Sequence, residues 1–113
     1  MIHFVGAGSG APDLITVRGQ KFLREADVVI YAGSLVNPEL LKETKPGCEI
    51  LNSAYMTLDE VIRAMEKAER EGKMTVRLHT GDPAIYGAIR EQMDRLEALG
   101  IPYEIVPGVS SFL

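Results

Sequence analysis

Short apolar runs alternate along the chain with longer segments in which apolar residues recur every three or four positions. The short runs are typical of β-strands, and the helical spacing is typical of amphipathic helices. Val28 to Ile30 are all β-branched and uninterrupted, which is the pattern of a strand covered on both faces. The sequence predicts strands at Ile2–Val5, Val28–Tyr31, Glu49–Leu51, Met74–Leu78 and Tyr103–Val106.

One helix is predicted between the third and fourth strands. Thr57 and Glu60 have the spacing of a capping box, which marks a helix start. Glu66 and Arg70 are placed to pair on the exposed side, and Gly72 follows where the helix is expected to end. The apolar stripe of this helix consists of Leu58, Val61, Ile62, Met65 and Ala68.

Three further helices are predicted from similar signals. One covers Thr16 to Arg24, and a short one runs from Pro38 to about Lys42. The last carries a stripe that ends before Gly100, formed by Ile89, Met93, Leu96 and Leu99. Strands that alternate with helices in this way predict an α/β fold, with a five-stranded, mainly parallel sheet flanked by helices.

The loops that leave the strands differ from the loops that leave the helices. Glycine, proline and small hydroxyl residues gather after the strands, and the loops after helices are short and plain. Because open α/β sheets bind ligands at the carboxyl ends of their strands, this asymmetry predicts a binding site there. The strand-exit loops are expected at residues 6–13, 32–37, 52–57, 79–87 and 107–111.

The first of these loops has a relaxed form of the dinucleotide-binding pattern, Gly6-x-Gly8-x-x-Ala11. Pro12 disfavours helical conformation at Ala11, and Asp13 would repel a pyrophosphate. The second strand is not followed by the acidic residue that binds a ribose, since Asp27 precedes that strand. A nucleotide phosphate remains an alternative ligand, and a less anionic ligand fits the loop better.

Two other loops contain candidate chemistry. Gly81-Asp82-Pro83 makes a tight bend with free backbone groups, although Asp82 would equally serve as a helix cap. His79 is a candidate acid–base group, and a structural role is the alternative. Ser110 and Ser111 either bond a ligand or cap a following helix. His3 falls in a strand expected to be buried, so we expect no metal site.

Composition and charge narrow the function classes. The chain has 113 residues, with 12 basic and 16 acidic side chains and a net charge of −4, which argues against binding of nucleic acid through bulk charge. No apolar run approaches the roughly 20 residues that span a bilayer, and no signal peptide is apparent. Cys48 is the only cysteine, which fits a reducing cytoplasm.

Four segments together resemble the tetrapyrrole methylases of cobalamin biosynthesis. They are IHFVGAGSGAPDLITVRG (Ile2–Gly19), VVIYAGSLV (Val28–Val36), RLHTGDPAIYG (Arg77–Gly87) and IPYEIVPGVSS (Ile101–Ser111). Within that family, the second and third segments look most like the precorrin-4 methyltransferase branch. The resemblance runs the length of the chain, in order and with matched spacing.

The resemblance implies an S-adenosylmethionine-dependent methyltransferase that methylates precorrin-4 or cobalt-precorrin-4 at ring carbon 11. It also implies a cytoplasmic homodimer of two-domain subunits, with the cofactor between the domains. Residues 1–113 would be the N-terminal α/β domain, the C-terminal domain would be absent from this chain, and the chain alone would be inactive. The implied cofactor contacts are Ser9, Thr80, Gly81, Asp82, Ile85, Ser110 and Ser111.

Two departures from the family pattern bear on mechanism. Ser9 stands where the family usually has proline, and Ala32 stands where related uroporphyrinogen methylases have an aspartate base. No catalytic residue is therefore assigned. Arg18, Arg77 and His79 are candidate cations for an acidic tetrapyrrole, with surface ion pairs as the alternative for both arginines.

Two other functions stay open. One is a sibling tetrapyrrole methylase that acts at another ring carbon. The other is a non-catalytic domain that binds a nucleotide or adenosine.

Overall fold

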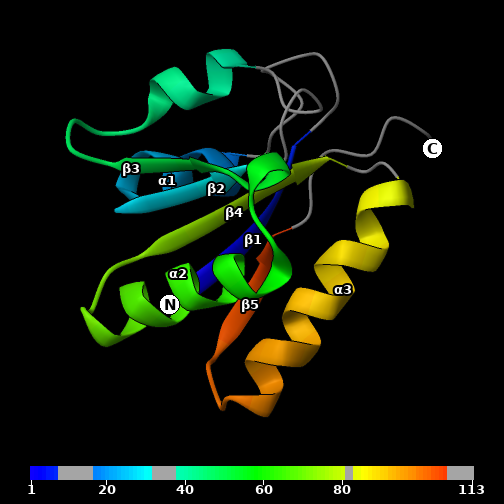
Figure 1. The fold of residues 1–113 in the computed structure, drawn as a ribbon. Coiled ribbons are helices and arrows are strands. Elements are labelled where there is room, and N and C mark those ends of the chain that lie inside the picture. Colours follow the sequence, from blue (N-terminus) through cyan, green and yellow to red (C-terminus); the bar gives the residue numbers. More distant parts are fainter. Residues whose placement is uncertain (8–16, 32–37, 81–82, 107–113) are drawn as a thin grey trace.

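The computed structural model describes residues 1–7, 17–31, 38–80 and 83–106. Five strands form one sheet in the order β3–β2–β4–β1–β5 (Figure 1). Every pairing among them is parallel, so their carboxyl ends lie along one edge of the sheet. This confirms the predicted α/β architecture. The strands are β1 (Ile2–Ala7), β2 (Val28–Tyr31), β3 (Glu49–Asn52), β4 (Thr75–Thr80) and β5 (Tyr103–Val106).

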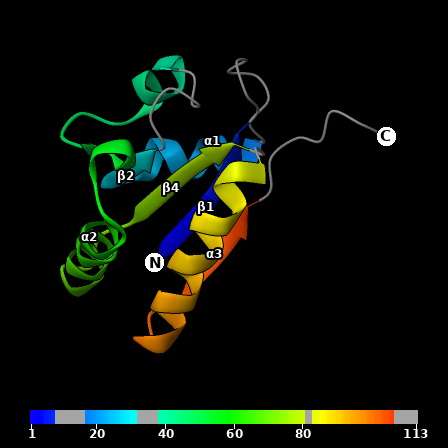
Figure 2. The ribbon, with the colours of Figure 1, turned by 45° about the vertical axis from the view of Figure 1, so that its right-hand side comes forward.

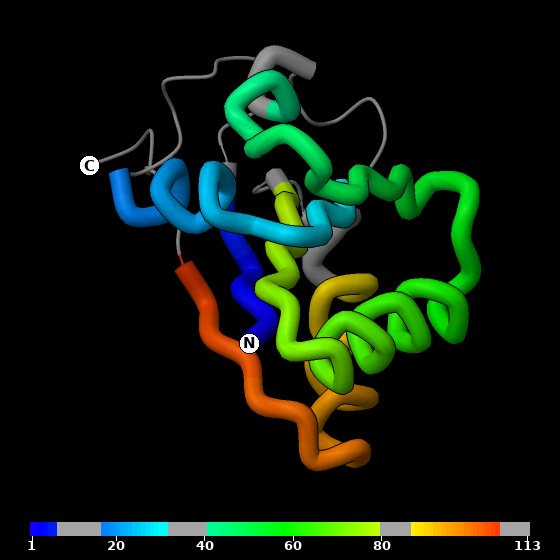
Figure 3. The backbone as a smooth tube through the Cα atoms, turned by 90° about the vertical axis from the view of Figure 1, so that its left-hand side faces the viewer, coloured from blue at the N-terminus to red at the C-terminus, as the bar shows by residue number. Residues whose placement is uncertain are grey.

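The helices cover both faces of the sheet. Helix α1 (Val17–Glu25) lies on the opposite side from α2 (Leu58–Arg70) and α3 (Pro83–Ala98) (Figures 2 and 3). Two short 3₁₀ helices complete the connections, η3 (Pro38–Glu43) before β3 and η4 (Ser53–Tyr55) after it.

The core follows from the alternation of side chains along the strands. In β1, Val5 packs with Leu23 of α1, whereas Ile2 and Phe4 pack with α2 and α3. All four side chains are fully buried. A strand that is apolar on both faces needs helices on both sides, which explains the three-layer arrangement.

The signals predicted for α2 are confirmed. The Thr57 hydroxyl accepts a hydrogen bond from the Glu60 amide, and the Glu60 carboxylate accepts one from the Thr57 amide. Arg70 pairs with Glu66 at 3.2 Å. Gly72 and Gly100, the predicted ends of α2 and α3, both have a φ of +71°, a conformation that favours glycine.

The end of α3 and the type of helix in η3 differ in detail from the prediction, whereas η3 begins at Pro38 as predicted. Leu99 is half exposed rather than part of the buried stripe, because α3 ends at Ala98 and the chain turns there. The segment after Pro38 is a 3₁₀ helix. None of the helices in the described ranges is both long enough and apolar enough to cross a membrane.

The predicted loop at residues 79–87 was wrong in extent. His79 and Thr80 continue β4, because they pair in register with Gly6 and Ala7 of β1. Pro83 is the first residue of α3, a position where the missing amide hydrogen of proline is not needed. Gly87 lies inside this helix, so its glycine signal did not mark a loop.

A carboxylate fastens three elements at the amino edge of the sheet. Asp27, just before β2, accepts a hydrogen bond from the Met74 amide at 2.9 Å and one from the Lys45 ammonium at 2.6 Å. Asp27 thus lies at the edge opposite the strand-exit loops, as its position in the sequence predicted. The Lys45 hydrogen bond, followed by the Met74 amide, lowers the pKa of Asp27.

The stability that Asp27 supplies should depend on pH. Because its pKa is lower in the folded chain than in the unfolded one, the contribution is fully present above the unfolded value of about 3.9 and is lost as pH falls through the folded value. We expect the loss in free energy of unfolding caused by Asp27→Asn to be clear at pH 7 and to shrink below about pH 4. Urea unfolding of both chains across this range measures it, and a pH-independent difference would contradict the assignment.

Thr75 presents an unsatisfied group in the core. It is fully buried between Ile2 of β1 and Val28 of β2, and its hydroxyl has no hydrogen-bond partner in the described part of the chain. A buried hydroxyl without a partner loses its hydration and gains nothing in return.

Replacing this hydroxyl by a methyl group should stabilise the fold. Thr75→Val keeps the side-chain shape and removes the unsatisfied group, so we expect a gain of about 1 kcal/mol in the free energy of unfolding. Thr75→Ser is the matched control, since it keeps the hydroxyl and loses a methyl, and it should cost about 1 kcal/mol. If urea unfolding finds Thr75→Val less stable than the parent chain, the hydroxyl has a partner.

Candidate functional site

The sheet has a topological switch point between β1 and β4. The connection from β1 passes through α1 on one face and leads to β2. The connection from β4 passes through α3 on the other face and leads to β5, in the opposite direction along the sheet. The two connections therefore diverge to opposite faces of the sheet from the adjacent carboxyl ends of β1 and β4. In open α/β sheets, ligands bind in the crevice that such a divergence creates.

The last residues of the two strands define the base of this site. Gly6 pairs in register with His79, and Ala7 pairs with Thr80. Gly6 has no side chain, so a ligand can approach the backbone closely at this point. His79 lies on the same face of β4 as Arg77 and is about nine-tenths buried. Helices α1 and α3 both begin at this edge, and their N-termini favour negatively charged groups.

Two of the predicted cofactor contacts belong to the elements that meet at this edge. Thr80 is the last residue of β4, and Ile85 lies in the first turn of α3. The other predicted contacts lie outside the described residues, and they are Ser9, Gly81, Asp82, Ser110 and Ser111. Ala32, the position of the base in related methylases, also lies outside them.

The same edge carries exposed apolar side chains. Val17, the first residue of α1, is 85% exposed, and Tyr55 of η4 is 87% exposed. The Ser53 hydroxyl donates a hydrogen bond of 3.0 Å to the carbonyl of Tyr31, which ties the ends of β2 and β3 together. The described part of the carboxyl edge thus presents apolar side chains to solvent.

Arg77 is buried beneath this edge, which corrects its prediction as a cation at the mouth of the site. Only 2% of the residue is exposed, so the alternative of a surface ion pair is also wrong. Its guanidinium donates to the side-chain oxygen of Gln92 at 3.0 Å and to the carbonyls of Ile30 and Leu78, both at 3.3 Å. Burial lowers the pKa of Arg77 to about 10, so the group stays charged at neutral pH.

Gln92 was missed by the sequence analysis. It is buried on α3 between Ile89 and Leu96, three and four residues away on the same helix face. A polar residue inside an apolar stripe was the available signal, since it needs a polar partner in the core.

Arg18 forms the surface ion pair that was the alternative to its role as a cation for an acidic tetrapyrrole. It lies near the start of α1, and its guanidinium is 3.3 Å from the carboxylate of Glu104. Glu104 also pairs with His3 at 2.7 Å, and the His3 ring stacks on Phe22 with 4.0 Å between centroids. His3 is buried as predicted, and this cluster fastens α1 to β1 and β5.

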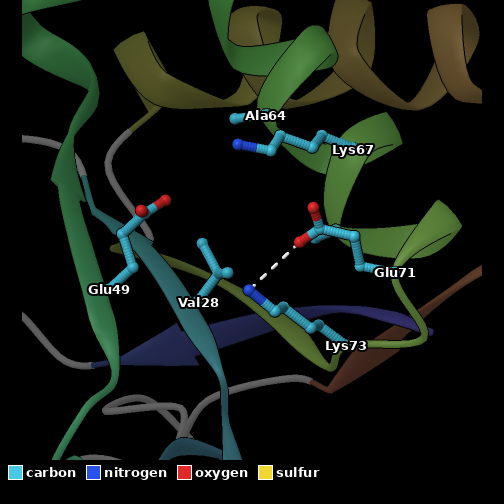
Figure 4. Close-up of a pocket in the computed structure, with 7 residues that line it drawn as sticks. Val28, Glu49, Ala64, Lys67, Glu71 and Lys73 are labelled. Atoms are coloured by element: carbon cyan, nitrogen blue, oxygen red, sulfur yellow. Dashed lines mark ion pairs between the residues drawn. The ribbon is translucent and has the colours of Figure 1, made fainter.

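A hollow lined by described residues lies at the opposite edge (Figure 4). It has a volume of about 210 Å³ and sits between α2 and the first residues of β2 and β3. Its charged lining consists of two lysines and two glutamates, of which Lys73 and Glu71 form an ion pair at 3.1 Å. Opposite charges in equal number give this hollow no clear preference for an acidic ligand. We therefore place the candidate site at the carboxyl edge.

The described ranges also contain no group of three or more residues that could hold a metal ion.

Comparison with known proteins agrees with this geometry. The family model of tetrapyrrole (corrin/porphyrin) methylases matches residues 1–113. The chain belongs to the tetrapyrrole methylases. This confirms the family resemblance found in the sequence.

Curated relatives of this methylase chain point to one branch of the family. It is 62% identical to cobalt-precorrin-4 C(11)-methyltransferase of Methanocaldococcus jannaschii, over 97% of the chain and 42% of that protein. It is 56% identical to the protein of the same name from Priestia megaterium, over 97% of the chain and 43% of that protein. Identity to uroporphyrinogen-III C-methyltransferase of Bacillus subtilis is 38%, over 98% of the chain and 24% of that protein.

Solved structures agree with the described fold. A cobalt precorrin-4 methyltransferase matches 97% of the methylase chain with a TM-score of 0.89 and 56% identity, over 46% of its own length. A uroporphyrin-III C-methyltransferase from Thermus thermophilus, complexed with S-adenosyl homocysteine, matches 97% of the chain with a TM-score of 0.77 and 36% identity, over 45% of its length. The chain thus spans less than half the length of these relatives.

Proposed function

We propose that the protein carrying this chain is an S-adenosylmethionine-dependent methyltransferase of cobalamin biosynthesis. Its substrate is precorrin-4 or cobalt-precorrin-4, and the methyl group goes to ring carbon 11. The observation that carries this proposal is the higher identity to C(11)-methyltransferases than to a uroporphyrinogen-III methyltransferase. The switch point between β1 and β4 supports it independently, because it offers a ligand site at the edge where the predicted contacts lie.

The proposed cofactor contacts come from three strand-exit segments. Ser9 follows β1 and the hydroxyl pair Ser110 and Ser111 follows β5. Thr80, Gly81, Asp82 and Ile85 span the junction of β4 and α3. These segments follow β1, β4 and β5, which are neighbours in the sheet.

Methyl transfer requires this chain mainly to position the two reactants. S-adenosylmethionine supplies a methyl group on a positively charged sulfur, which leaves when the methyl is transferred. The chain's share is to hold two reactants in line, and orientation alone can account for a large part of a rate enhancement. This agrees with a site in which no catalytic residue is assigned.

Residues 1–113 form the N-terminal α/β domain in this proposal, and a second domain supplies the other wall of the site. Relatives more than twice as long as the chain support this, as do the exposed Val17 and Tyr55 at the carboxyl edge. The whole protein would be a cytoplasmic homodimer that needs neither a membrane nor a nucleic acid.

Ligand preference separates this proposal from the non-catalytic alternative. The experiment uses a protein of the relatives' full length that carries this chain. We expect calorimetry to detect binding of S-adenosylhomocysteine and to find that NAD and ATP bind much more weakly. Tighter binding of NAD or ATP would restore the dinucleotide interpretation of Gly6-x-Gly8-x-x-Ala11.

The product separates carbon 11 from the other ring carbons. We expect the full-length protein to add one methyl group to precorrin-4 or its cobalt form, with mass spectrometry giving the count and NMR the position. The isolated 113 residues should give no turnover, because half of the site is missing. A methyl group at another carbon would assign the protein to a sibling methylase, and turnover by the isolated chain would overturn the two-domain site.

A further inference from the structure

Arg77 and Gln92 are the feature of the carboxyl edge that the proposed function does not use. The Arg77 guanidinium touches three elements, namely α3 through the Gln92 side chain, β2 through the Ile30 carbonyl and its own strand through the Leu78 carbonyl. Both carbonyls belong to the last two rungs of the β2–β4 pairing. The contacts therefore join the end of this ladder to the middle of α3.

All of the acceptors described for this buried cation are neutral. No carboxylate within the described ranges contacts Arg77, although the residue is 98% removed from solvent. Burying a charge without an opposite charge is unfavourable, and an apolar side chain would join β4 to α3 without that cost. The directional hydrogen bonds are what an apolar side chain could not provide.

Directional contacts matter here because apolar packing does not by itself fix the position of α3 along its own axis. Ile89 and Leu96 bury α3 against the sheet, but apolar contacts are not directional and tolerate a small slide of the helix along its axis. Gln92 lies between them on the same helix face, and its 3.0 Å bond to Arg77 has a definite length and angle. That bond restrains the position of α3 along its axis, and with it the position of the junction between β4 and α3.

We propose that Arg77 and Gln92 form a positioning strut that sets the axial position of α3 on the sheet. The inference rests on the proposed function in one respect. The junction of β4 and α3 is where most of the proposed cofactor contacts fall, so the strut positions them without touching the ligand.

The test compares variants in a protein of the relatives' full length that carries this chain. Arg77→Met and Gln92→Met each break the strut with little change in side-chain volume. The double variant completes a double-mutant cycle with the two single variants. Arg77→Lys keeps the positive charge but lacks the planar guanidinium. Arg90→Met is the matched control, because Arg90 is an exposed arginine on the same helix, paired only at its surface with Asp94. Two quantities are measured where each variant is folded: amide hydrogen exchange along α3, and affinity for S-adenosylhomocysteine.

We expect faster exchange in the first turn of α3 than in its last turn for both single variants, and affinity lower by about tenfold or more. The double variant should resemble the single ones, since the second change removes a bond already broken. Arg77→Lys should fall between, and Arg90→Met should match the parent. If Arg77→Met does not fold, Gln92→Met and Arg77→Lys carry the comparison.

Unchanged exchange in the first turn of α3, or effects of the two single variants that simply add, would overturn the strut. Altered exchange in a protein whose parent form does not bind S-adenosylhomocysteine would leave the strut standing and overturn the proposed function. Altered exchange with unchanged affinity would overturn the link between the strut and the ligand site.

Discussion

The parallel pairing of β1 with β4 is the contact on which the rest of the molecule depends. It puts two strands that are more than 70 residues apart in the sequence side by side at the centre of the sheet. The connection from β1 leads to α1 on one face of the sheet, and the connection from β4 leads to α3 on the other face. Gly6 and His79 meet at this point, so the candidate site is a consequence of strand order more than of any one residue.

Polar contacts hold β4 at its amino end and, through Arg77, farther along the strand. Asp27 binds the amide of Met74 at the amino end, and Arg77 binds two carbonyls and Gln92 near the carboxyl end. A slip of β4 by one residue would turn Arg77 to the α1 face, among apolar residues such as Val5 and Leu23. These polar contacts therefore specify the pairing register of β4 more strictly than apolar packing alone would.

Much of the fold could be predicted from the sequence, because its local signals agree with its tertiary structure. The uninterrupted run at Val28 and the capping box at Thr57 each predicted their elements closely. Residues 79–87 could not be placed, because His79 and Thr80 are strand residues only through pairing with β1, which is non-local. Arg77 was misjudged for a related reason, since nothing in its neighbourhood along the chain reveals a buried partner 15 residues away. The edge that carries the site was predictable from loop composition, but the contacts of Arg77 were not.

The strand order also constrains how the chain assembles as it is synthesised. Among the described strands, β1 pairs with β4 and β5 alone, and β4 begins at Thr75, so the first strand made has no such partner until about two-thirds of the 113 residues exist. Until then only the short β2–β3 pair can form, and a two-stranded pair is marginal in water. Until then, the apolar residues of β1 and α1 lack the sheet that buries them in the folded chain. During this period, chaperone binding or misassociation competes with folding. The place of β4 between β1 and β2 thus makes a late segment of the chain necessary for closing the centre of the sheet.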